Sequence, residues 1–188
     1  MTIRIVLDLS ENDLEHFRHL AKQAMANSEQ EPIEKVIAGA HALVEEVNEK
    51  VASDFIRDRI GQIRILCDML QDQGWGMQEV GRRRVKAALA YFNQPEDLIP
   101  DHLPGIGFLD DAIMIELLSR ELKPEIDAYR DFVDYRATEA RRLGKSPDEL
   151  NRGDYLEARQ KALLSRMRRR RRGGRGGGGG AKSPFSLF

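Results

Sequence analysis

The sequence predicts an all-α protein: a compact multi-helix bundle with a short N-terminal β-strand and a disordered, basic, Gly/Arg-rich C-terminal tail. Apolar residues recur at helical spacing along most of the chain, and 41 % of the 188 residues are hydrophobic, which is enough to build a core. Glycines and arginines then replace this pattern near the C-terminus. We expect an N-terminal strand and helical extension at 1–75, a helical domain at 76–145, a basic helix at 146–172 and a disordered tail at 173–188.

The N-terminus combines a strand pattern with a helix start. Apolar side chains occupy every second position of residues 3–9, the period of a β-strand, and Ser10 and Asp13 resemble a capping box that opens a helix to about Ala26. Such a strand could pair with a second copy, so a homodimer is one expected arrangement. Ribbon-helix-helix DNA-binding regulators begin similarly. The outward residues of the strand would be Thr2, Arg4 and Val6. The acidic body and the long connector between the helices disfavour that DNA-binding interpretation.

Apolar stripes predict six further helices. Their expected ranges are 32–50, 53–73, 77–92, 109–123, 124–143 and a last one from about 154. Their inward residues include Val36, Ile37, Ala40, Val44, Val47, Ile56, Ile60, Ile63, Leu70, Val80, Val85, Leu89, Ile126, Tyr129, Phe132 and Val133. Cys67 falls on such a stripe, which predicts a buried thiol, and Trp75 is expected to cover the core.

The loop at 93–111, here called the Pro–Asp loop, interrupts the helices with three prolines and two glycines up to Gly107. Residues 80–135 resemble the YkvA-like family, a bacterial helical domain of unknown function. The matching residues are Pro95, Asp97, Leu98, Ile99, Pro100, Asp101, Pro104, Gly107, Leu109, Asp110 and Asp111. The resemblance implies a compact helical domain and no established reaction.

One segment departs from the family pattern. Relatives often carry a more apolar stretch after the Asp–Asp pair, which is interpreted as membrane-embedded. Here residues 112–123 include Glu116, Arg120, Glu121 and Lys123. Charged side chains at mid-bilayer are costly, so we do not expect this segment to insert into a membrane.

Four aspartates of the Pro–Asp loop have two interpretations. Brought together, Asp97, Asp101, Asp110 and Asp111 could hold a divalent cation such as Mg²⁺ or Ca²⁺. Alternatively, Asp97 and Asp110 cap helices, and Asp101 or Asp111 pairs with Arg82, Arg83 or Arg84. We favour the structural interpretation, because aspartates prefer caps and turns. No resident cofactor is expected.

Catalytic motifs are not recognisable in the sequence. His16 and His19 share a helix face, but zinc sites normally need at least three protein ligands. Cys67 is the single cysteine, which excludes an intramolecular disulfide and fits a reducing compartment. We therefore expect a non-enzymatic protein.

The C-terminal region is strongly basic. From Arg166 onward there are eight basic and no acidic residues, which leaves a net charge of −9 for residues 1–165. The arginines are Arg166, Arg168, Arg169, Arg170, Arg171, Arg172 and Arg175. They could bind RNA, DNA or an anionic lipid surface. The alternative is a solvated tail that contacts the acidic body of its own chain.

These observations predict a cytoplasmic, non-enzymatic interaction or regulatory protein that binds a protein partner of unknown identity. Three alternatives stay open. The chain could act on nucleic acid through its arginines, associate peripherally with the inner membrane, or carry a metal-dependent activity at the aspartates.

Overall fold

The computed structural model describes residues 8–28, 30–50, 53–93, 106–150 and 161–169, together with single residues at positions 6, 99, 103 and 158. These residues form α-helices and short 3₁₀ turns, which confirms the all-α class. The helices are α1 (Glu11–Ser28), α2 (Ile33–Lys50), α3 (Asp54–Ile60), α4 (Ile63–Gln71), α5 (Glu79–Ala90), α6 (Leu109–Glu121) and α7 (Lys123–Leu143), with 3₁₀ turns η1 (Tyr91–Asn93) and η2 (Pro147–Glu149). Residues 161–169 are also helical. Most of the predicted strand, and the whole tail at 173–188, lie outside the described residues.

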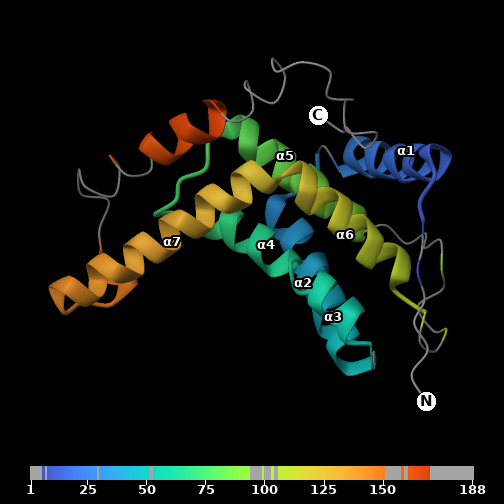
Figure 1. The fold of residues 1–188 in the computed structure, drawn as a ribbon, viewed down its shortest axis with the longest axis horizontal. Helices are drawn as coiled ribbons and strands as arrows, with labels where there is room; N and C mark the ends of the chain where they lie inside the picture. The colour runs from blue at the N-terminus through green and yellow to red at the C-terminus, as the bar shows by residue number, and fades with distance from the viewer. Residues whose placement is uncertain are drawn as a thin grey trace.

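The bundle is organised around α2, which packs against α3, α4 and α5. Helix α1 packs against α5, and α6 lies against α3 and α7 (Figure 1). The inward stripe of α2 is the predicted one, with Val36, Ala40 and Val44 buried. The apolar residues that recur every three or four positions therefore determine which face of α2 packs into the core.

The core runs from α1 to the last described helix without interruption. Trp75 is fully buried, with its ring 5.7 Å from that of Tyr129 and 5.2 Å from that of Phe132. This confirms its predicted role over the core. Cys67 is buried as predicted, and burial raises the pKa of its thiol to about 12, so the thiol is not a ready nucleophile.

Local signals mark the start of α1 and the end of α7. The Ser10 N–H donates to Asp13 Oδ2 at 2.8 Å and the Asp13 N–H donates to Ser10 Oγ at 3.3 Å, which confirms the capping box. Helix α7 ends at Leu143 and is capped by Gly144, whose φ of 65° lies in the left-handed region that glycine adopts without strain.

Three sequence predictions need correction. The expected helix at 53–73 is two helices, because the chain tightens into i→i−3 hydrogen bonds around Gly61: the Gln62 N–H donates to Arg59 O at 3.0 Å and the Ile65 N–H donates to Gln62 O at 3.1 Å. Val80 was expected inward but is 72 % exposed. It lies five residues before Val85 and therefore about 140° around the helix from it. Helix α7 also begins one residue earlier than predicted, at Lys123.

Candidate functional site

The Pro–Asp loop is described only in part. Gly107, Asp110 and Asp111 lie within the described residues, whereas Pro95, Asp97, Pro100, Asp101 and Pro104 lie outside them. After Gly107 the backbone of Phe108 adopts φ 63°, an uncommon value for a residue with a side chain. Because the Phe108 ring is fully buried, packing holds this conformation at the start of α6.

Asp110 ties the loop to the helix that follows it. It is the second residue of α6 and is 2 % exposed, and its Oδ2 accepts the backbone N–H of Ile99 at 3.1 Å. Its carboxylate also lies at the positive end of the helix dipole. This geometry gives Asp110 a structural contact, although not the predicted helix cap, because the N-cap of α6 is Phe108. Asp111 beside it is buried as well.

Metal binding finds no support in the described part of the chain. Those residues contain no group of three or more His, Cys, Asp or Glu side chains placed to hold a metal ion. Asp97 and Asp101 lie outside them, so the four-aspartate site stays a prediction.

The three consecutive arginines of α5 have different partners. Arg82 Nη1 donates to the backbone carbonyl of Leu70 at 3.0 Å, and Arg83 Nε lies 3.0 Å from Glu79. Arg84 is largely buried and lies 3.3 Å from Glu125 Oε1. Burial raises the pKa of Glu125 to about 7, although the Arg84 charge opposes this rise.

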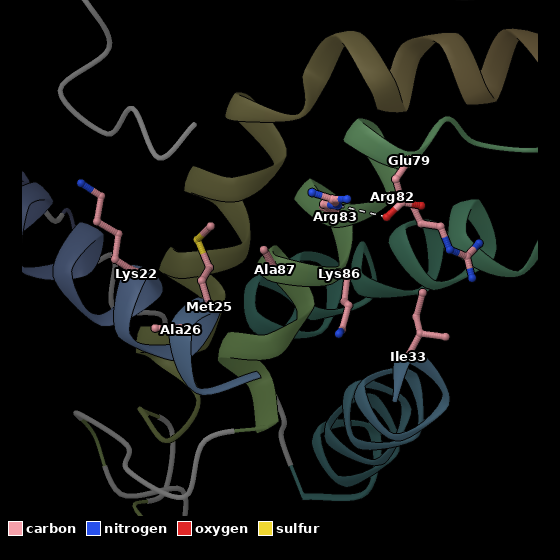
Figure 2. Close-up of a pocket in the computed structure, with 9 residues that line it drawn as sticks. All are labelled: Lys22, Met25, Ala26, Ile33, Glu79, Arg82, Arg83, Lys86 and Ala87. Carbon is pink, nitrogen blue, oxygen red and sulfur yellow. Dashed lines mark hydrogen bonds and ion pairs between the residues drawn. The ribbon is translucent and has the colours of Figure 1, made fainter. Parts of the chain in front are cut away.

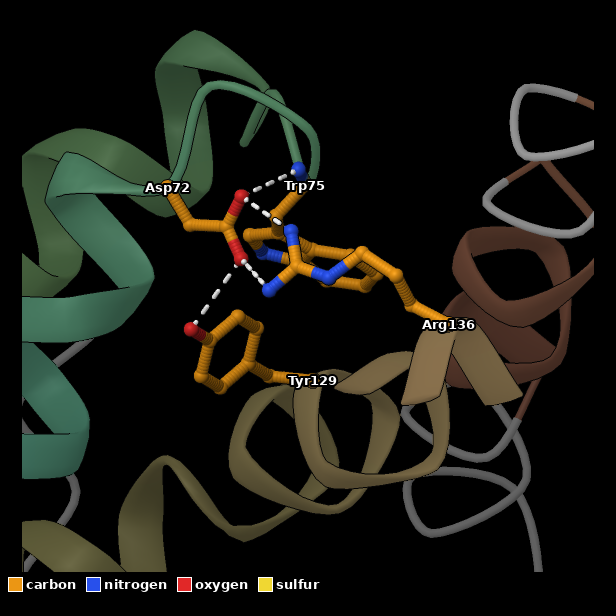
Figure 3. Close-up of polar contacts among 4 residues, drawn as sticks. All are labelled: Asp72, Trp75, Tyr129 and Arg136. Atoms are coloured by element: carbon orange, nitrogen blue, oxygen red, sulfur yellow. Dashed lines mark hydrogen bonds and ion pairs between the residues drawn. The ribbon is translucent and has the colours of Figure 1, made fainter. Parts of the chain in front are cut away.

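A polar cluster that sequence reasoning missed joins the end of α4 to α7 (Figure 3). Asp72 accepts hydrogen bonds from Arg136 Nη1 at 2.9 Å, from the Trp75 backbone N–H at 3.1 Å and from the Tyr129 hydroxyl at 3.2 Å. Burial alone would raise the pKa of Asp72, but these hydrogen bonds and the Arg136 charge outweigh it and lower the pKa. Tyr129 and Arg136 lie 57 and 64 residues from Asp72, so only the tertiary fold brings these two side chains to it.

A depression of about 750 Å³ lies beside the packed helices α1 and α5, with the start of α2 at one side (Figure 2). We call it the basic groove. The charged residues that line it are Lys22, Glu79, Arg82, Arg83 and Lys86, and its larger apolar lining residues are Met25 and Ile33. The charge cluster on α5 is visible in the sequence, but the contribution of Lys22 depends on how α1 packs.

The C-terminal arginines begin on a helix that is part of the fold. Leu163 and Leu164 are buried in the core, whereas Arg166, Arg168 and Arg169 are exposed. Arg166 lies 3.8 Å from Asp131 of α7, a contact with the acidic body. The remaining predicted arginines, Arg170, Arg171, Arg172 and Arg175, lie outside the described residues.

Comparison with known proteins identifies the family. A family described as "Protein of unknown function (DUF1232)" matches residues 85–117. The "Uncharacterized membrane protein YkvA" of Bacillus subtilis (strain 168) is 33 % identical over 98 residues, which cover 49 % of this chain and 84 % of the relative. The chain belongs to the YkvA-like family. The family match includes all of α6 except its last turn. No solved structure shows significant similarity to the chain.

The relative corrects one expectation. We predicted a cytoplasmic interaction or regulatory protein, and this is wrong, because the curated YkvA relative is described as a membrane protein. Among the described residues of this chain, no helix is both long and apolar enough to cross a bilayer. The charges that distinguish residues 112–123 form ion pairs, such as Glu116 with Arg59 at 2.9 Å.

Proposed function

We propose that the chain is a peripheral membrane-associated protein that attaches to an anionic surface, such as the inner membrane, through its C-terminal arginines. The observation that carries the proposal is the exposure of Arg166, Arg168 and Arg169 on a helix that Leu163 and Leu164 anchor in the core. Basic side chains near an anionic membrane each contribute about 1 kcal/mol of attraction. The membrane description of the YkvA relative supports the same assignment.

The geometry favours attachment by a defined face. Because the two leucines fix the helix to the bundle, the three arginines have a set position relative to the folded body rather than a random one. Asp131 partly neutralises the charge of Arg166, so Arg168 and Arg169 provide most of the expected attraction to an anionic membrane. The net charge of −9 on residues 1–165 opposes binding through the acidic surfaces of the body.

Vesicle flotation with the full chain tests the proposal. The wild type should float with vesicles of phosphatidylcholine and phosphatidylglycerol, but not with phosphatidylcholine alone, and high salt should release it. Changing Arg166, Arg168 and Arg169 to Gln should weaken the partition coefficient by roughly 30- to 150-fold, which corresponds to two or three lost contributions of about 1 kcal/mol.

The matched control changes three exposed arginines elsewhere to Gln: Arg57, Arg64 and Arg120. It removes the same charge, so equal losses in the two triple variants would refute attachment through the C-terminal helix. If the wild type floats with neither kind of vesicle, the membrane proposal as a whole is refuted.

A further inference from the structure

The basic groove gathers positive charge from helices that are distant in sequence. Lys22 lies on α1, whereas Arg82, Arg83 and Lys86 lie on the first two turns of α5. Glu79 is the one acidic side chain among the described residues that line the groove, and it pairs with Arg83. The lining therefore carries four positive charges against one negative.

Two features prepare these cations to receive an anion. The bond from Arg82 Nη1 to Leu70 O holds the guanidinium in place with one of its five N–H groups. Arg82 also lies in the first turn of α5, near the positive end of the helix dipole. Arg82, Arg83 and Lys86 are neighbouring like charges on one helix, so an anion beside them would reduce their mutual repulsion.

The apolar part of the groove indicates what kind of anion it would hold. Met25 and Ile33 line it beside the basic side chains, and Val80 projects from the first turn of α5 with 72 % of its surface exposed. A free phosphate would need the cations but not the apolar surface. A phospholipid needs both, because its phosphate is esterified to a glycerol that carries the acyl chains. The volume of about 750 Å³ is within the range of small-molecule sites.

We propose that the basic groove binds the phosphate headgroup of an anionic phospholipid, with the α5 cations on the phosphate, Lys22 adding positive charge at the edge of the groove, and Met25 and Ile33 against the glycerol and upper acyl chains. The inference rests on the proposed membrane attachment and gives it a specific lipid contact. It places Val80 at the bilayer surface, where an exposed apolar side chain is favourable.

Chemical-shift mapping with soluble short-chain lipids tests this site without requiring a membrane. The full chain is titrated with dihexanoyl phosphatidylglycerol below its micelle concentration, with dihexanoyl phosphatidylcholine, and with inorganic phosphate. We expect the backbone amides of Lys22, Met25, Ile33 and Lys86 to shift with the phosphatidylglycerol, and far less with the other two probes.

Two double variants measure the contribution of the groove charges. Lys22→Gln/Arg83→Gln removes two exposed cations from the groove, and it should weaken phosphatidylglycerol binding about tenfold or more. Lys50→Gln/Arg64→Gln removes the same charge from α2 and α4, away from the groove, and should leave binding within about twofold of the wild type. Because all four side chains are exposed, both variants should keep the wild-type circular dichroism spectrum.

The outcomes separate the two proposals. Groove shifts with the short-chain lipid support the headgroup site even if the C-terminal arginine variant still floats normally. Equal shifts with inorganic phosphate would overturn the lipid assignment in favour of a free phosphate ligand. No groove shifts, or equal losses in the two double variants, would overturn the headgroup site while leaving attachment through Arg166, Arg168 and Arg169 intact.

Discussion

Glu125 should make the stability of the protein depend on pH in an unusual direction. The carboxyl is 2 % exposed beside Arg84, and burial raises its pKa from 4.5 to about 7. Between these two values the folded state holds a proton that the unfolded state has lost. The contribution of Glu125 to the free energy of unfolding is therefore fully present below about pH 4.5 and is lost as pH rises through about 7.

The magnitude follows from the two pKa values. A separation of about 2.5, at about 1.4 kcal/mol for each pKa unit, gives a loss on the order of 3 kcal/mol between acid and neutral pH. Glu125→Gln keeps the size of the side chain and cannot ionise, so it should lack this component. The wild type should lose about 3 kcal/mol more than the variant when urea unfolding is measured from about pH 4.5 to about pH 8.

Comparing the two pH profiles removes the contributions of all the other carboxyl groups. Glu46→Gln is the matched control, since it neutralises an exposed carboxylate that pairs with Lys50 on α2. That change should alter stability by about 0.5 kcal/mol and leave the shape of the profile unchanged. Parallel profiles for the wild type and Glu125→Gln would refute the argument from burial.

Three further substitutions test the packing. Asp72→Asn removes the charge that Arg136 binds at 2.8 Å and should lower the free energy of unfolding by about 3 kcal/mol, measured in urea; a loss below about 1 kcal/mol would contradict the cluster's role. Gly39→Ala would place its Cβ against the Asn93 carboxamide, so it should destabilise the wild type but stabilise an Asn93→Ala background by about 1 kcal/mol, in a double-mutant cycle. Gly144→Ala meets no atom within 4 Å but keeps φ 65°, so thermal melting should show a loss of about 1 kcal/mol from backbone strain alone, and no loss would mean that the helix end relaxes.

Local chemistry explains which parts of the fold were predictable. The stripe of α2 follows from its spacing, and the Ser10–Asp13 box follows from two side chains that bind each other's backbone. The break at Gly61 was not predictable in this way, because Ile60 and Ile63 are both buried and the apolar stripe continues across it. Periodicity reports which side of the chain is buried, not whether its axis bends.

The candidate sites likewise contain some residues that the sequence indicates and others that only the tertiary fold brings in. The exposed arginines from Arg166 onward are visible as a charge run, and the cations of α5 are visible as a cluster within one helix. Lys22 joins that cluster only because α1 packs on α5, and Asp72 meets Arg136 only because α4 packs on α7. These tertiary contacts depend on how the whole bundle packs, so no short sequence motif predicts them.

The charges of α6 connect the family pattern to the proposed mode of attachment. Glu116 pairs with Arg59, and Glu121 lies 3.6 Å from Arg84, while Met114 and Ile115 are buried in the core. Moving this helix into a bilayer would break these ion pairs and also uncover the core, two costs that add. Membrane contact is thus less costly at surfaces that are already basic and exposed. The basic groove and the C-terminal arginines meet that condition on a body that otherwise carries a net negative charge, so attachment should be oriented and sensitive to salt.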